Sequence, residues 1–240
     1  MLSEKIILEL AKKWQTTEAN IAREYLQHLF LRSFYKFEES GKILFKGRTA
    51  LRIVYGSPRF SEDLDFSAQT RSYSLIEKLI EETLLRLSLE EKIELVEAKT
   101  TTGGYLAQVL GKIGGLSVKI QIEISQRNGR TIEPDSFLVS SPFLPEYLIL
   151  TFPRNLLIAE KIQACLTRQK SRDFFDIYFL LRKGILGEFL KDYQKPLLAS
   201  LNYLDSAAVL KELKPLLPSS HQILVRSLKE NLIRELEKFK

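Results

Sequence analysis

The stretch that decides the fold runs from residue 43 to residue 67 and reads ILFKGRTALRIVYGSPRFSEDLDFS. A short apolar run ends at Lys46 and Gly47, a helical turn follows, and the last residues alternate between acidic and apolar side chains. On a β-strand, residues two apart point to the same side, so Asp63 and Asp65 share one face. Two carboxylates that close repel each other unless a cation lies between them. The pair is therefore either an incidental feature of a solvated strand end or a cation site.

A third carboxylate belongs to a second strand pattern, VKIQIEIS, at residues 118–125. Its apolar residues alternate with polar ones, which predicts a strand with one face on the core and Glu123 on the other. If this strand lies beside DLDFS, then Asp63, Asp65 and Glu123 converge. Carboxylate oxygens without cysteine or histidine favour a hard cation, Mg²⁺ or Mn²⁺. The alternative is a solvated strand face with scattered acids.

The turn between the first strand and the helical segment is a candidate phosphate site. Gly47 permits a sharp turn there, and the first amides of TALRIVYG would then face an anion with the helix dipole behind them. The residues of this turn that we expect to contact a nucleotide are Lys46, Gly47, Arg48 and Thr49.

A second cluster of charged residues lies in a helical stretch, NLLIAEKIQACLTRQKSRDFFDIYFLL, which starts at residue 155. Lys161 and Arg168 lie along one side of its first helix, and Asp173 and Asp176 are three apart on its second. One interpretation is a set of ion pairs across a helical hairpin. The other has Lys161, with Arg168, contacting a triphosphate, and Asp176 orienting a base or that lysine.

Hydrophobic periodicity predicts an α+β chain with a mixed sheet in its first part and helices after it. We expect domains at residues 1–150 and 151–240. The predicted helices cover residues 3–14, 17–38, 73–88, 155–169 and 171–183, and short ones follow to the end. The predicted strands are KILFK, DLDFS, IELVEA, YLAQVL, LSVKIQIEI and TIEPDSFLV, with turns at Gly103-Gly104 and Asn128-Gly129.

Composition narrows the class of protein. The chain has one cysteine, which excludes an internal disulfide and a cysteine metal cluster, and no apolar run approaches the ~18 residues of a membrane span. We therefore expect a cytoplasmic protein without a membrane partner. Residues 1–150 carry 20 basic and 20 acidic residues, whereas residues 151–240 carry 16 and 10. The excess of 6 in the second part suits a polyanionic partner such as nucleic acid, or serves solubility alone.

Three strings together resemble the AbiEii/AbiGii toxin family of DNA polymerase β-like nucleotidyltransferases. They are FKGRTALRIVYGSPRFSEDLDF, VKIQIEI and AEKIQACLTRQKSRDFFDIYFLL, which lie between about Leu44 and Leu181. The resemblance implies a nucleotidyltransferase-type mixed β-sheet flanked by helices, followed by a C-terminal helical bundle. It also implies an NTP substrate, Mg²⁺ (or Mn²⁺), a tRNA 3′ end as acceptor, and a cognate antitoxin as partner.

The resemblance also assigns roles to individual residues. It makes Gly47 the phosphate-loop glycine, Asp63 and Asp65 the metal-binding pair, and Glu123 the third carboxylate. In the helical part, the resemblance makes Lys161 the lysine that contacts the nucleotide and Asp176 the closing aspartate of the family pattern. The implied catalytic residues are therefore Asp63, Asp65, Glu123, Lys161 and Asp176.

Arg48 departs from the family pattern, which usually has a second glycine or a serine at this position. Its side chain would either obstruct the triphosphate or bind phosphate through its guanidinium. Two alternatives to RNA modification stay open, the first with a different acceptor and the second because of Arg48. One is nucleotidylation or phosphorylation of a protein hydroxyl, and the other is a degenerate domain that only binds a partner.

Overall fold

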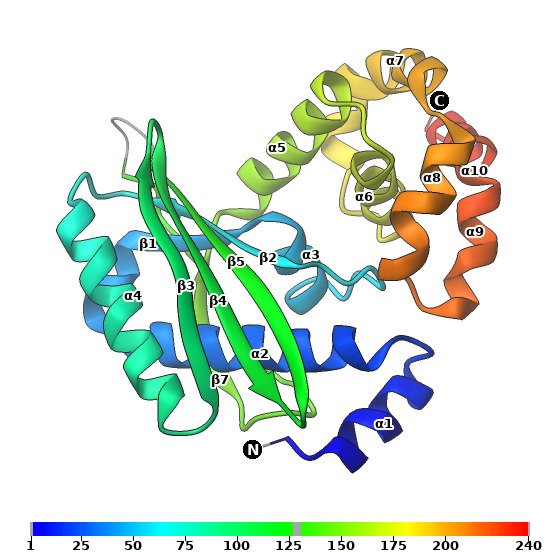
Figure 1. Cartoon of the computed structure of the whole chain (residues 1–240). Coiled ribbons are helices and arrows are strands. Elements are labelled where there is room, and N and C mark those ends of the chain that lie inside the picture. The colour runs from blue at the N-terminus through cyan, green and yellow to red at the C-terminus, as the bar shows by residue number, and fades with distance from the viewer. Residues whose placement is uncertain (1, 127–130, 240) are drawn as a thin grey trace. The chain divides into compact units, whose positions relative to one another are not determined.

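The computed structural model describes residues 2–126 and 131–239 and divides the chain into two units (Figure 1). Unit 1 comprises Met1–Gly56 and Phe60–Pro153, and unit 2 comprises Ser57–Arg59 and Arg154–Lys240. The sequence pattern predicts a boundary after residue 150. The structure divides the chain after Pro153 and also places the three loop residues Ser57–Arg59 with unit 2.

Unit 1 is built on a mixed sheet, which has seven strands in the described residues, in the order β3-β4-β5-β2-β1-β7-β6. Helices α2 and α4 pack against the same side of this sheet (Figure 1). The strands are β1 (Ile43–Lys46), β2 (Asp63–Ala68), β3 (Lys92–Thr101), β4 (Gly104–Ile113), β5 (Leu116–Gln126), β6 (Asp135–Val139) and β7 (Tyr147–Thr151). The helices are α1 (Glu4–Lys13), α2 (Glu18–Phe34), α3 (Gly47–Ile53) and α4 (Tyr73–Ser88).

Aromatic rings join α2 to the centre of the sheet. Phe30 and Phe34 of α2, Phe45 of β1 and Phe66 of β2 are fully buried, and Phe66 lies within 6.3 Å of each of the other three rings, centroid to centroid. Large buried aromatic side chains contribute strongly to core stability. Because Phe66 points towards α2, the residues on either side of it in β2 point to the opposite side of the sheet.

Unit 2 is helical beyond its three loop residues. Its helices are α5 (Arg154–Thr167), α6 (Ser171–Arg182), α7 (Leu190–Ser200), α8 (Ser206–Leu213), α9 (Gln222–Arg226) and α10 (Leu228–Glu237). α6 buries most of its residues, and α5, α8 and α10 pack against it. α10 has leucines at spacing four, Leu228, Leu232 and Leu236, and all three are buried. This is the stripe that an amphipathic helix presents to a core.

The α+β class and the mixed sheet followed by helices are confirmed. β7 is a strand that the pattern analysis missed, because YLILT is a short apolar run between Pro145 and Pro153 without the polar alternation of the predicted strands. The predicted turn at Asn128-Gly129 lies outside the described residues. Among the residues that the structure describes, no helix has both the length and the apolar character needed to cross a bilayer.

Candidate active site

Strand register brings the predicted carboxylates to one face of the sheet. β2 runs parallel to β5, with Asp65 opposite Glu123 and Asp63 opposite Gln121. β1 runs antiparallel to β2 and places Lys46 opposite Asp65. Residues opposite each other on neighbouring strands share a face, so this face carries three carboxylates and a lysine. It is the face that points away from α2.

Gly47 is required by the position of the Asp65 carboxylate. Its φ of +81° lies in the left-handed region that glycine adopts without strain. A Cβ at this position would lie 2.0 Å from Oδ2 of Asp65 and 2.6 Å from its Cβ and Cγ. The chain therefore has a glycine here for two reasons, the backbone conformation and the close approach of a carboxylate. The predicted turn at Gly47 is present, and α3 begins at this residue.

Asp63 lies between like charges and one arginine. Burial raises the pKa of its carboxyl above the usual range, Asp65 raises it further, and Glu123 adds to the shift, whereas Arg48 opposes it. Nη2 of Arg48 lies 3.4 Å from Oδ2 of Asp63. One arginine at that distance does not balance burial and the neighbouring carboxylates, so this site favours an additional cation.

Arg48 and Thr49 face different partners. Nη1 of Arg48 is buried and has no hydrogen-bond partner among the described residues. Such an unmatched donor next to a turn is chemically suited to an anionic ligand. Thr49 is buried, and its hydroxyl donates to the backbone carbonyl of Asp63, which ties α3 to the start of β2. The Thr49 side chain thus fixes the turn, and its hydroxyl is not turned towards an open surface.

A cavity of about 390 Å³ opens beside the carboxylates in unit 1. Lys46, Asp65 and Glu123 line it together with the β3–β4 turn, including Gly103 and Gly104. Glu123 is exposed, and its Oε1 accepts a hydrogen bond from the Gln121 amide. This volume lies within the range of small-ligand pockets, ~300–1,000 Å³.

The carboxylates do not form a complete set of protein ligands for a metal ion, but they suit the way in which Mg²⁺ is usually held. Across the described part of the chain, no group of three or more His, Cys, Asp or Glu side chains is arranged to hold a metal ion. Mg²⁺, however, is usually held by one or two carboxylates together with water and substrate phosphates. The Asp63–Asp65 pair, with a raised pKa at Asp63, has the donor type and the number that this mode needs.

The second predicted cluster lies within unit 2 and is an ion-pair cluster. Nζ of Lys161 lies 3.0 Å from Oδ2 of Asp176, and Nη2 of Arg59 lies 2.7 Å from Oδ1 of the same carboxylate. All three side chains are buried. Burial alone would raise the pKa of Asp176, but the charges of Arg59 and Lys161 outweigh it and hold this pKa below its usual range. Asp176 is therefore the buried anion of this cluster and lies between the two cations.

Arg168 and Asp173 form the other ion pair of the helical hairpin. Nη2 of Arg168 lies 2.7 Å from Oδ1 of Asp173, which is buried, whereas about half of the arginine side chain is exposed. The ion pairs predicted across the hairpin are thus confirmed. They do not exclude a nucleotide contact, since the exposed part of Arg168 remains accessible.

Two arginines of the same segment, Arg59, which is buried, and Arg52, which is partly buried, were missed by the sequence reasoning. Arg59 lies in the quoted string and is the second cation on Asp176. Arg52 of α3 pairs with Glu24 of α2 at 2.7 Å and lies over the Phe60 ring at 3.5 Å. Arginines in a loop or on a short helix are usually exposed. The one local signal for burial of Arg59 is its position between Ser57-Pro58 and the aromatic Phe60.

Among the comparisons with known proteins, a family model identifies the family of the chain, and solved structures show a similar fold. The family model described as nucleotidyl transferase AbiEii toxin, type IV toxin-antitoxin system, matches residues 29–233. No curated protein sequence matches the chain. Among solved structures, the chain is similar to MenT4, a nucleotidyltransferase toxin from Mycobacterium tuberculosis H37Rv, with a TM-score of 0.61 and 15% identity over 100% of this chain and 91% of that one. It is also similar to JHP933 from Helicobacter pylori, with a TM-score of 0.54 and 22% identity over 93% and 95%.

Proposed function

This chain belongs to the AbiEii family of nucleotidyltransferase toxins of type IV toxin-antitoxin systems, and on that premise we propose that it transfers a nucleotide from an NTP to RNA. The proposed acceptor is the 3′ end of tRNA, and the proposed cofactor is Mg²⁺ or Mn²⁺. A cognate antitoxin would restrain the activity in the cytoplasm. One observation carries the proposal: Asp63, Asp65 and Glu123 share a sheet face beside the glycine turn at Gly47.

The proposed reaction balances simply. The acceptor hydroxyl oxygen forms a bond to the α-phosphorus, the bond from that phosphorus to the β-phosphate bridging oxygen breaks, and pyrophosphate leaves. The hydroxyl proton goes to Glu123, which is exposed at the cavity and accepts a hydrogen bond from Gln121 through Oε1. Because no bond to the protein forms, catalysis depends on positioning and on charge neutralisation.

The remaining roles follow from charge. Asp63 and Asp65 would hold the ion, which supplies positive charge to the triphosphate when bound. Lys46 lines the cavity and would contact phosphate, and Arg48 would add its unmatched Nη1 donor. Thr49 would act through the hydrogen bond that fixes the turn.

For unit 2, the proposal rests on the family resemblance and on the ion-pair cluster. Lys161 would contact the nucleotide, with Asp176 orienting its ammonium, and Arg168 would meet phosphate through its exposed side. The excess of positive charge in residues 151–240 supports an RNA acceptor, and binding should then weaken steeply with salt.

The test is label transfer. Purified protein is incubated with each α-labelled NTP, total tRNA, and either Mg²⁺ or Mn²⁺. We expect label on tRNA, and we expect a loss of about 100-fold or more in Asp63→Asn and in Asp65→Asn. Glu146→Gln, an exposed acid before β7, is the matched control and should retain activity. Calorimetry with Mn²⁺ alone should show weaker binding to the two aspartate variants.

Other outcomes select the alternatives. Label on a protein band and none on RNA would select modification of a protein hydroxyl. Absence of transfer and of nucleotide binding in the folded protein, with rescue of binding in Arg48→Gly, would select a degenerate domain in which Arg48 closes the site.

A further inference from the structure

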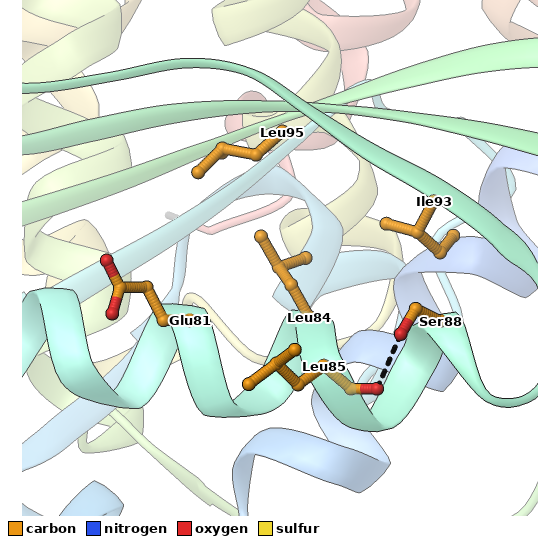
Figure 2. Close-up of a pocket in the computed structure, with 6 residues that line it drawn as sticks. All are labelled: Glu81, Leu84, Leu85, Ser88, Ile93 and Leu95. Carbon is orange, nitrogen blue, oxygen red and sulfur yellow. Dashed lines mark hydrogen bonds between the residues drawn. The ribbon is translucent and has the colours of Figure 1, made fainter.

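A second cavity, of about 350 Å³, lies between α4 and β3, outside the candidate active site. Figure 2 shows Leu84 and Leu85 of the helix on one side, and Ile93 and Leu95 of the strand on the other. Glu81 lies at one end of this set, and Ser88 at the other. The cavity is therefore an open apolar groove between a helix and a strand, and we name it the α4–β3 groove.

Large apolar side chains are exposed in and around the α4–β3 groove. The exposed fraction is 67% for Leu85, 87% for Leu89, 41% for Leu95 and 51% for Val96. Leu85 and Leu95 line the groove itself, whereas Leu89 and Val96 follow directly after its lining residues Ser88 and Leu95 in the chain. Single exposed apolar residues are normal, but several in and around one groove are typical of an interaction site. These four residues lie within twelve positions of the sequence. Their grouping is the reason to look for an occupant.

The structure of the sheet edge indicates whether a strand or a helix would bind in the α4–β3 groove. β3 is the outermost strand, and in the described residues it pairs only with β4. Its register shifts between Leu95 and Glu97, so Val96 forms a bulge. A bulge interrupts the row of backbone groups that an added strand would need. An amphipathic helix needs no such row, because it binds a groove through side chains three and four apart.

Charge indicates the chemistry of the occupant. Residues 77–97 contain seven acidic and three basic residues, a net charge of −4 in a chain whose total is +6. Glu77 and Glu81, one helical turn apart, have no ion-pair or hydrogen-bond partner among the described residues. An acidic rim repels nucleic acid and attracts lysine and arginine. The acidity of the groove thus contrasts with the rest of the molecule.

We propose that the α4–β3 groove is the docking site for a basic amphipathic helix of a protein partner. Apolar side chains of that helix fill the groove between Leu85 and Leu95, and its lysines or arginines lie against Glu77 and Glu81. The site is separate from the carboxylate face, because Ile93 and Leu95 point to the side of the sheet that α4 covers. The proposal does not depend on the nucleotidyltransferase reaction.

The test uses the full chain and three labelled synthetic peptides of about 18 residues, since shorter peptides form helices poorly in water. The first has leucine at helical spacing of three and four, with lysine elsewhere. The second has the same composition in scrambled order, and the third has glutamate in place of lysine. Fluorescence anisotropy should show binding of the first peptide only.

Variants locate the binding. Leu85→Ser combined with Leu89→Ser should weaken the first peptide about 10-fold or more. Leu138→Ser combined with Leu148→Ser is the matched control, because both leucines are 61% exposed on other strands. Glu81→Lys should weaken the lysine peptide and strengthen the glutamate peptide, which a merely unfolded groove would not do.

Three results would overturn the proposal. They are equal binding of the scrambled peptide, equal loss in the control pair, and a dimer in solution that only the Leu85 and Leu89 changes dissociate. The last result would identify a second copy of the chain as the occupant. All three are independent of label transfer, so failure of the proposed enzymatic function leaves this test unaffected.

Discussion

The two charged clusters of the molecule are opposite in design. In unit 1, Asp63 lies near three other carboxylates, those of Asp65, Glu123 and Glu62, and one arginine, and its pKa is raised. In unit 2, Asp176 is fully buried between two cations, Arg59 and Lys161, and its pKa is lowered. The first cluster is short of positive charge, whereas the second already contains it. Both clusters come from motif residues, so membership in a motif does not by itself say what a residue does.

The difference separates stability from ligand binding. Removing a carboxylate that lies between buried cations is strongly destabilising, because the positive charges stay buried without that negative charge. A carboxylate among like charges destabilises the fold unless a cation binds, which is the state that a metal or substrate site requires. Substitutions in the two clusters should therefore have opposite effects on stability.

The largest effect is expected at Asp176. Asp176→Asn leaves Arg59 and Lys161 buried without their carboxylate, and breaking such a cluster costs about 3–5 kcal/mol of unfolding free energy. Urea denaturation measures it. Glu212→Gln, an exposed acid in the same unit, should stay within about 0.5 kcal/mol of the wild type. An Asp176→Asn protein as stable as this control would contradict a stabilising cluster.

An intermediate effect is expected at Gly47. Gly47→Ala strains the backbone and displaces the Asp65 carboxylate, so we expect a loss of about 1–3 kcal/mol and loss of label transfer. Gly115→Ala is a close match, because φ is +85° there and no atom lies within 4 Å of a new Cβ. It should show the strain without the loss of activity. Equal activity in the two variants would mean that the contact with Asp65 is unimportant.

The smallest effect, and one of opposite sign, is expected at Asp63. A raised carboxyl pKa means that the folded protein holds its proton more tightly than the unfolded chain does, so ionisation at neutral pH destabilises the fold. Asp63→Asn removes that penalty and should stabilise the protein at pH 7 by up to about 1 kcal/mol. The gain should shrink as the pH falls through the raised pKa towards the ordinary carboxyl range. It should be absent below that range, where the carboxyl is protonated in both states. Thermal melts at pH 7 and pH 3 measure it.

Because the Asp63 cluster lacks positive charge and the Asp176 cluster contains it, a bound metal ion should stabilise only the first. If Mn²⁺ binds at Asp63 and Asp65, saturating Mn²⁺ should raise the melting temperature of the wild type more than that of Asp63→Asn. Asp176→Asn should keep the shift, provided that it folds. An equal shift in the wild type and Asp63→Asn would place the ion elsewhere.

Local sequence patterns predicted most helices and strands of the fold and the carboxylate part of the candidate site. The alternation in DLDFS and in VKIQIEIS was enough to place Asp63, Asp65 and Glu123 on outward faces, since strand periodicity is a local property. That the two strands are neighbours was a hypothesis, which the parallel pairing of β2 and β5 confirms. The same reasoning missed β7, whose short length and flanking prolines hide it.

Long-range pairing set the limit of prediction. Arg59 and Asp176 are 117 residues apart in the chain, and no periodicity links a loop arginine to a distant helix. The ion pair of Lys161 with Asp176 was foreseen because both lie in one helical hairpin. The unmatched Nη1 of Arg48 also depends on the packing of α3. A short stretch of sequence contains information on contacts within one hairpin, but not on contacts between segments far apart in the chain.

The membership of Ser57–Arg59 in unit 2 has a consequence for synthesis of the chain. On the ribosome, Arg59 emerges 117 residues before its carboxylate partner. At roughly 5–20 residues per second this is a delay of about 6 to 23 seconds. During that interval the Arg59 guanidinium lacks the carboxylate that it contacts in the folded protein. The same membership means that a nascent chain released near residue 153 would contain Arg59 but neither Lys161 nor Asp176, the other two members of the cluster.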